Sequence, residues 1–134
     1  MKGKATTIYI ILFCIYLAAV GVVCFIKPSS IPEMNLKTFL GIPIDKVLHF
    51  LMFIPYPILA GPVFIGRDCS FICGAVIISI IAVTGAGVAY GTELIQAQTG
   101  YRSYEIGDFH ADITGIITGS MTAIAYLTYT RLKK

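Results

Sequence analysis

Residues 69–96 have the sequence CSFICGAVIISIIAVTGAGVAYGTELIQ, and this stretch decides the fold. Its apolar part, residues 69–92, contains no Asp, Glu, Lys or Arg, and the stretch then ends on Glu93 and Gln96. A transmembrane helix needs about 20 predominantly apolar residues. The stretch is therefore predicted to be a membrane-spanning helix with polar side chains at one end.

Three further stretches without charged residues are residues 5–26, 50–66 and 113–130. The two shorter ones each gain about a turn from an adjoining acidic segment, which predicts helices over 5–26, 44–66, 69–96 and 108–131. Charged residues make up 13% of the chain, against roughly 25% in soluble proteins. Residues 1–134 are therefore predicted to form one all-α integral membrane domain, a bundle of four transmembrane helices.

The first stretch follows Lys2 and Lys4 and could be confused with a signal peptide. Its apolar part is much longer than the roughly 7–15 residues of a signal-peptide core. We therefore expect a retained helix.

Positive charge is distributed unequally about the predicted helices. With four helices both termini share a side, and that side carries six positive residues: Lys2, Lys4, Arg67, Arg131, Lys133 and Lys134. The other side carries Lys27, Lys37 and Arg102, with Lys46 at the membrane edge. The positive-inside rule then places both termini in the cytoplasm. The lipid bilayer is the expected partner, and no basic patch for nucleic acid is present.

Prolines and cysteines give two further expectations. Pro55, Pro57 and Pro62 lie within the second predicted helix, which should therefore be bent or broken near its middle. Cys69 and Cys73 lie near the predicted cytoplasmic end of the third helix. A reducing compartment favours free thiols there.

The connections between the last three helices are short, so alternate helix ends meet at one face of the membrane. This face, called the polar rim below, collects Asp45, Lys46, His49, Glu93, Gln96, Arg102, Glu105, Asp108 and Asp112. Charge at membrane depth is costly and by default marks a functional site. The predicted rim is extracytoplasmic.

Small residues indicate which way the acids of the last helix point. Asp108 and Asp112 share a helical face with Gly115 and Gly119. Small residues at four-residue spacing let transmembrane helices approach closely. These carboxylates should therefore point into the bundle, and packing within the bundle is a better explanation of the glycines than dimerisation.

Three interpretations of the polar rim remain open. In a structural one, the ion pairs Asp45–His49, Glu93–Lys46 and Asp108–Arg102 would hold the helix ends together. In a second, the rim binds a lipid-linked or cell-wall headgroup through Asp45, Lys46, Gln96, Arg102 and Asp112. Arg102 suits bidentate recognition of carboxylate or phosphate.

The third interpretation is chemical. The catalytic candidates are His49, Glu93 and Asp108, with His49 as a general base held by Asp45 and Glu93 as the acid. The candidate metal ligands are His49, Glu93, Asp108 and Asp112. A carboxylate-rich set with one histidine suits a divalent cation such as magnesium, manganese or calcium better than zinc. The sequence leaves open whether the protein is an enzyme.

These residues resemble the motifs of the VanZ-like membrane protein family. Asp45-Lys46-Val47-Leu48-His49-Phe50 resembles the D-K-x-x-H-F opening of the family, and Glu93-Leu94-Ile95-Gln96 resembles its E-x-x-Q element. Arg102-Ser103, followed by residues 108–112 and Gly115, resembles the closing R-x … D-x-x-A-N-x-x-G segment. Asp112 departs from the pattern, which usually has Asn at that position.

The resemblance implies a cell-envelope function, because the family takes its name from lowered susceptibility to the glycopeptide teicoplanin. On that basis we expect a membrane protein that binds or alters a cell-surface component. The alternative is a membrane-embedded enzyme, dependent on a divalent cation, that acts on a lipid-linked envelope substrate.

Overall fold

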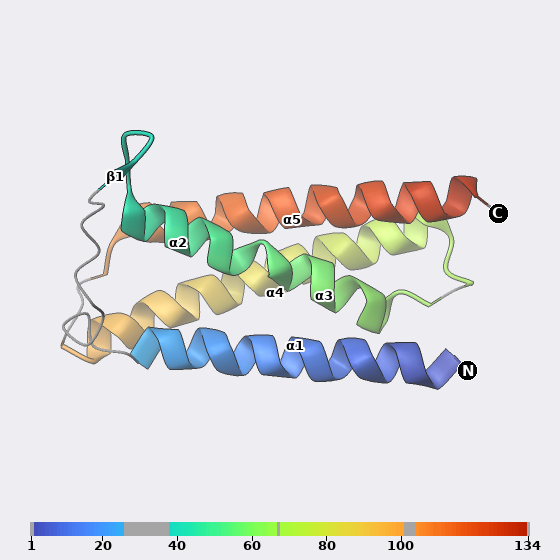
Figure 1. Cartoon of the computed structure of the whole chain (residues 1–134), viewed down its shortest axis with the longest axis horizontal. Coiled ribbons are helices and arrows are strands. Elements are labelled where there is room, and N and C mark those ends of the chain that lie inside the picture. Colours follow the sequence, from blue (N-terminus) through green and yellow to red (C-terminus); the bar gives the residue numbers. More distant parts are fainter. Residues whose placement is uncertain (1, 26–37, 67, 101–103, 134) are drawn as a thin grey trace.

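The chain forms an elongated bundle of helices in a computed structural model that describes residues 2–25, 38–66, 68–100 and 104–133. The elements in chain order are α1 (Lys2–Phe25), β1 (Thr38–Phe39), β2 (Ile42–Pro43), α2 (Ile44–Phe53), α3 (Pro55–Phe64), α4 (Phe71–Gln98) and α5 (Ile106–Leu132). Figure 1 shows the helices side by side along the long axis, with the start of α1 and the end of α5 at the same end. The opposite end carries the starts of α2 and α5 and the end of α4.

Within the described residues, three helical segments are long and apolar enough to cross a membrane: Gly3–Cys24, Ile44–Phe64 and Phe71–Gln98. The chain is thus consistent with a membrane-embedded helical protein, as the composition predicted. Helix α5, with 27 residues, is one residue shorter than α4 but is not among these segments. Two aspartates in its first two turns and a series of threonines make it more polar.

The second predicted helix is bent, which confirms the expectation from its prolines. Helix α2 ends at Phe53 and α3 begins at Pro55, while Ile54 between them keeps helical angles of φ −56° and ψ −45°. Pro55 and Pro57 have no N–H to donate to the preceding turn. The chain therefore changes direction without unwinding.

Helix α5 packs directly on the backbone of this bent segment. A Cβ added at Gly115 would collide with the carbonyl oxygen of Phe50, and one added at Gly119 would collide with that of Ile54. Glycine is thus required at both positions for the helices to lie this close. The prediction that the two glycines serve packing within the bundle is confirmed.

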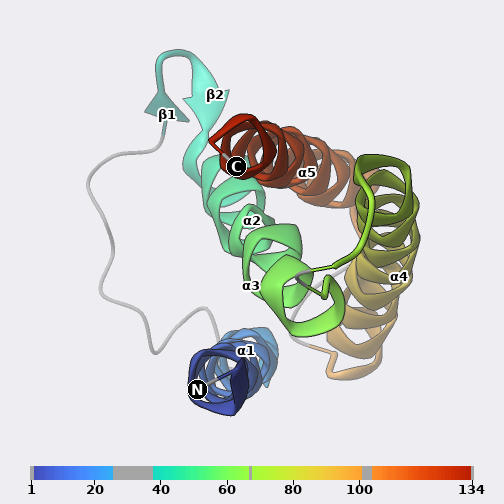
Figure 2. The ribbon, with the colours of Figure 1, turned by 90° about the vertical axis from the view of Figure 1, so that its right-hand side faces the viewer.

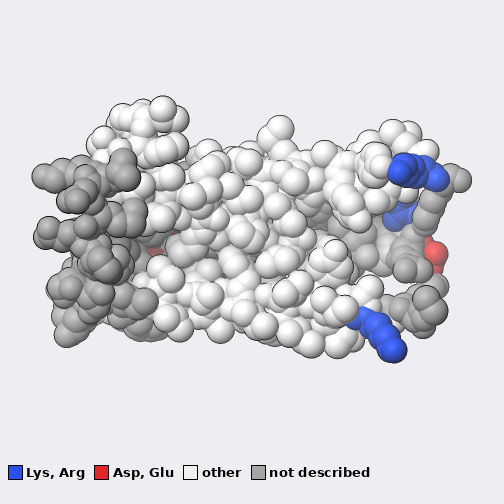
Figure 3. Space-filling view, in the orientation of Figure 1, with Lys and Arg blue, Asp and Glu red and all other residues white. Residues whose placement is uncertain are grey.

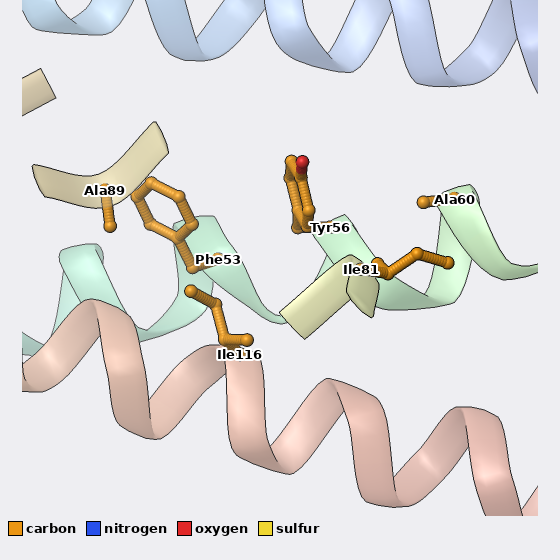
Figure 4. Packing of buried hydrophobic residues seen from close by; sticks show 6 residues of the cluster. All are labelled: Phe53, Tyr56, Ala60, Ile81, Ala89 and Ile116. Atoms are coloured by element: carbon orange, nitrogen blue, oxygen red, sulfur yellow. The ribbon is translucent and has the colours of Figure 1, made fainter. Parts of the chain in front are cut away.

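The buried core lies midway along the bundle. Phe53, Tyr56, Ala60, Ile81, Ala89 and Ile116 form one cluster drawn from α2, α3, α4 and α5. Figure 4 shows the Phe53 ring beside Ala89 of α4, with Ile116 of α5 on its other side. This contact fixes the separations of three helices one turn away from the polar rim.

Helix α1 is attached along the side of this unit. Figure 2, viewed from the end of the bundle that carries the termini, shows α1 next to α3 and apart from α5. The Tyr16 hydroxyl donates to the Met52 carbonyl at 2.8 Å. The rings of Phe13 and Tyr16 lie 5.5 and 6.5 Å from that of Tyr56.

The structure pairs Cys69 with Cys73 in a disulfide, so the prediction of free thiols was wrong for these two residues. Cys69 precedes the helix-capping residue Ser70, and Cys73 lies in the first turn of α4. Their Cα atoms are 5.8 Å apart, within the range that a disulfide spans. The helix predicted over 69–96 included both cysteines, whereas α4 begins between them, at Phe71.

Charged residues are concentrated toward the two ends of the bundle. In Figure 3 the middle of the visible face shows none of the described Lys, Arg, Asp or Glu residues. Lys and Arg side chains are visible at the end that carries the termini. Acidic atoms are just visible between the helices toward the other end, where the polar rim lies.

Candidate functional site

Three buried ionisable side chains from three different helices meet at the polar rim. His49 of α2 is 4% exposed, Glu93 of α4 is 1% exposed and Asp112 of α5 is 0% exposed. One ligand atom from each lies within 4.8 Å of the other two. We call these three residues the buried triad.

Helix geometry explains why these three residues meet. Each lies one turn from a core residue, since His49 and Asp112 precede Phe53 and Ile116 by four positions, and Glu93 follows Ala89 by four. Residues four apart lie on the same face of a helix. Because α4 runs antiparallel to α2 and α5, all three steps lead from the core toward the rim (Figure 1).

Both ring nitrogens of His49 have carboxylates nearby. Its Nδ1 is 3.0 Å from Asp112 Oδ1, a hydrogen bond in which the ring N–H donates to the carboxylate. The same nitrogen is 3.8 Å from Glu93 Oε1. On the other side of the ring, Nε2 is 3.6 Å from Asp108 Oδ2.

A second, more exposed group of charges covers the triad. Lys46 Nζ lies 2.5 Å from Glu105 Oε1 and 3.0 Å from Asp108 Oδ1. Asp45 lies 4.0 Å from the same nitrogen, with its side chain 42% exposed. Lys46 therefore neutralises part of the acidic surplus beside the triad and has no ion pair with Glu93 or Asp112 among the described contacts.

Glu93 is also tied to the start of α5. The backbone N–H of Glu105 donates to the Glu93 carboxylate. Glu105 is the residue that precedes the first turn of α5. The N–H groups at the start of a helix have no partner within the helix and favour negative charge. This contact places Glu93 against the helix that carries Asp112.

The ion pairs expected from the sequence were wrong where the structure describes both partners. His49 pairs with Asp112 rather than Asp45, and Lys46 pairs with Glu105 and Asp108 rather than Glu93. The pair Asp108–Arg102 falls outside the described residues. Asp45 lies one turn from His49 on the same helix but is turned toward solvent, whereas α5 approaches α2 closely enough for Asp112 to reach the ring.

The structure brings together most of the predicted site residues. Glu93 and Asp112 lie on the Nδ1 side of the His49 ring and Asp108 on its Nε2 side, where Lys46 contacts Asp108. Gln96 is buried at 2% exposure, one turn beyond Glu93. Asp45 remains at the periphery, and Arg102 lies outside the described residues. Glu105 was placed in the polar rim without a partner, although its position just before the last predicted helix, at the same rim as Lys46, could have indicated the ion pair.

One atom of the triad has an unmet bonding requirement. Asp112 Oδ2 is buried and has no hydrogen-bond partner among the residues that the structure describes. Buried polar groups in proteins are generally hydrogen-bonded, so each exception needs an explanation. The arrangement is suited to holding a cation or a polar headgroup, and its His49–Asp112 pair is suited to moving a proton.

Comparison with known proteins adds no further assignment: no family model, no curated protein and no solved structure matches the chain.

Proposed function

We propose that the chain is a VanZ-like protein of the bacterial cytoplasmic membrane that lowers susceptibility to teicoplanin-type glycopeptides. In this proposal the buried triad and its surrounding charges bind or alter a component of the cell surface. One observation carries the proposal: three helices each contribute a buried ionisable side chain to one cluster at a helix end. Retaining such groups at membrane depth is costly and by default indicates function.

The motif residues support this assignment through their positions. His49, Glu93 and Asp108 come from the three motif segments that resemble the family, and both carboxylates lie within 4 Å of the His49 ring, Glu93 near Nδ1 and Asp108 near Nε2. Segments separated along the chain thus supply one site. A purely structural role needs ion pairs, but it gives no reason for two carboxylates to face one imidazole nitrogen.

The test is teicoplanin susceptibility in a susceptible bacterium that expresses the protein or a variant. Wild type should raise the minimum inhibitory concentration, and His49→Ala and Glu93→Gln should abolish the increase. The matched control is His110→Ala, because His110 is exposed on α5 only two positions before Asp112. Membrane levels and helicity of each variant must equal those of wild type. Full protection by folded His49→Ala and Glu93→Gln would refute the proposal.

A second candidate function is a membrane-embedded enzyme that acts on a lipid-linked envelope substrate. The specific observation in its favour is the His49–Asp112 hydrogen bond at 3.0 Å, since a carboxylate that orients an imidazole is the usual arrangement of a general base. Turnover of an envelope lipid by purified wild type, absent in His49→Ala, would support it. No turnover across the lipids of the host envelope would leave binding as the function.

The proposed orientation has both termini in the cytoplasm and the triad near the outer surface, on the basis of the charge distribution. The Cys69–Cys73 disulfide lies at the opposite end from the triad, where this orientation gives a reducing compartment. A reducing compartment disfavours a disulfide, so the state of this cysteine pair in growing cells tests the orientation. Thiol labelling of intact and permeabilised cells checks this. The labelled protein carries Cys14→Ala and Cys24→Ala, so that the two free cysteines give no signal. A disulfide in intact cells would reverse the orientation.

A further inference from the structure

The strongest unexplained feature of the site is the charge within the buried triad. Glu93 and Asp112 supply two carboxylates, and a protonated His49 supplies one positive charge. Lys46, the nearest described lysine, already contacts Glu105 and Asp108. Buried charges are ordinarily paired or coordinate a metal ion. The triad as described has a surplus of acceptor oxygens.

A second observation, which does not depend on that charge count, is that Asp112 Oδ2 has no hydrogen-bond partner among the described residues. Its residue is completely buried, and its other oxygen accepts from His49. A carboxylate oxygen accepts bonds and cannot donate them when ionised. It therefore needs a hydrogen-bond donor or a cation within the same buried space.

The two nitrogens of His49 are oriented as in a metal-binding histidine. Nδ1 faces the carboxylates of Glu93 and Asp112, while Nε2 faces Asp108 at 3.6 Å. A histidine that ligates a metal through one nitrogen almost always donates its other N–H to a carboxylate, carbonyl or water. Asp108 is in turn held by Lys46 at 3.0 Å, which fixes its place behind the ring.

We propose that the buried triad binds one divalent first-row metal ion through His49 Nδ1 and the carboxylates of Glu93 and Asp112. Asp108 is then a positioning residue that accepts from His49 Nε2–H. When the ion binds, the proton on Nδ1 leaves, and the ring keeps its N–H on the side of Asp108. The ion neutralises both carboxylates and provides the partner that Asp112 Oδ2 lacks.

The donor set indicates the kind of ion. One imidazole and two carboxylates combine ligands preferred by zinc and iron with ligands preferred by manganese. Three protein ligands leave coordination positions open for water or a substrate oxygen, as in catalytic metal sites. Mn²⁺ is therefore a suitable probe, because it accepts both donor types and its unpaired electrons report on the bound nitrogen.

The inference deepens the proposed function by naming an occupant of the same site, and it rests on that proposal only for the role of the ion. Binding is measured without reference to resistance. The purified full-length chain in detergent, freed of metal, is titrated with Mn²⁺ while electron paramagnetic resonance follows the free ion. Wild type should bind one ion per chain, and the bound signal should show coupling to one nitrogen.

Variants assign the ligands. His49→Ala should remove the nitrogen coupling, and His49→Ala, Glu93→Gln and Asp112→Asn should each weaken binding by more than about a hundredfold, beyond what outer contacts contribute. Asp108→Asn should keep the nitrogen coupling and weaken binding by about tenfold to a hundredfold. The control His110→Ala should leave both affinity and coupling unchanged.

Several results would overturn the inference. One is the absence of tight Mn²⁺ binding to folded wild type, with Zn²⁺ and Fe²⁺ equally unbound. Another is bound Mn²⁺ without nitrogen coupling, which would assign the ion to the second acidic cluster, Asp45, Glu105 and Asp108. The coupling is measured on wild type, so the test stands even if a variant fails to fold. Metal binding in a protein whose His49→Ala variant still protects cells would uphold this inference and refute the proposed function.

Discussion

Helices α1 and α5 are of similar length but form very different contacts. Helix α1 is apolar all round, with large side chains such as Ile8 and Ile15 more than half exposed. Its contacts with the rest of the bundle include the Tyr16 hydroxyl and the Phe13 ring, and its buried hydrophobic residues are Val20 and Cys24. Helix α5 is more polar, yet it buries Asp112, Gly115 and Gly119 against α2, α3 and α4. Greater apolarity therefore does not mean deeper burial when lipid is the solvent for apolar side chains.

The difference shows which helices of this protein need specific packing partners. An apolar helix surface can face lipid at little cost, so α1 needs few specific contacts. A helix with two aspartates in its first turns must instead bury them among partners. The polar rim lies at the end of α5 where its aspartates must be buried and where Gly115 and Gly119 let α5 approach α2 closely.

The largest effect should come from removing the imidazole of the triad. His49→Ala leaves Glu93 and Asp112 facing each other without it, and breaking a buried pair in this way costs about 3–5 kcal/mol. Unfolding by denaturant in mild detergent, followed by helicity, measures the loss. Thr7→Ala, on the exposed part of α1, should change stability by less than about 0.5 kcal/mol.

A triple variant separates stability from function. His49→Leu, Glu93→Gln and Asp112→Leu together remove all three charges, and replacing every partner of a buried polar group can be nearly neutral. We expect the triple variant to recover most of the stability that His49→Ala loses. It should nevertheless give no protection against teicoplanin. Protection by this variant would mean that the triad serves only to hold the helices together.

Glycine substitutions should give the next largest contrast. Gly119→Ala puts a methyl group against the Ile54 carbonyl and the Pro57 ring, and overpacking of this kind costs about 1–3 kcal/mol. In α1, a Cβ at Gly21 meets nothing within 4 Å. Gly21→Ala should therefore be neutral or stabilising by up to about 1 kcal/mol, since alanine favours a helix. Equal effects at both sites in the same unfolding assay would contradict the difference between the two helices.

One contact that attaches α1 to the bundle is the hydrogen bond from the Tyr16 hydroxyl to the Met52 carbonyl. Tyr16→Phe keeps the ring contacts and removes that bond, for a loss of about 1 kcal/mol. Unfolding of the purified variant gives the loss, and Mn²⁺ titration shows whether the triad is affected. We expect unchanged binding, because α1 contributes no residue to the site; weakened binding would mean that α1 helps to shape it.

The smallest effect should come from the exposed charges of the rim. Lys46→Met removes the contacts with Glu105 and Asp108, which are partly in solvent, and such ion pairs contribute about 1 kcal/mol or less. The difference from wild type should shrink as salt is added, because screening weakens exposed pairs. A salt-independent loss as large as that of His49→Ala would place Lys46 among the buried essential charges.

Much of the site could be predicted from the order of apolar stretches. The charge-free runs indicate helices, and short connections bring His49, Glu93 and Asp108 to one end. The prolines at 55 and 57 indicate the bend, because a missing N–H has a local effect that the sequence displays. The disulfide could not be predicted, because it depends on the helix starting between Cys69 and Cys73 rather than before both.

The sequence by itself determined that a long apolar chain places its ionisable residues at helix ends, since spacing along a helix is fixed by backbone geometry. Only the tertiary structure decided which carboxylate His49 contacts. Asp45 is the nearer acid in sequence, but Asp112 is the partner in space, 3.0 Å from the ring. The reason is that Gly115 and Gly119 let α5 lie against the backbone of α2, and the distance between two helices depends on residues of both.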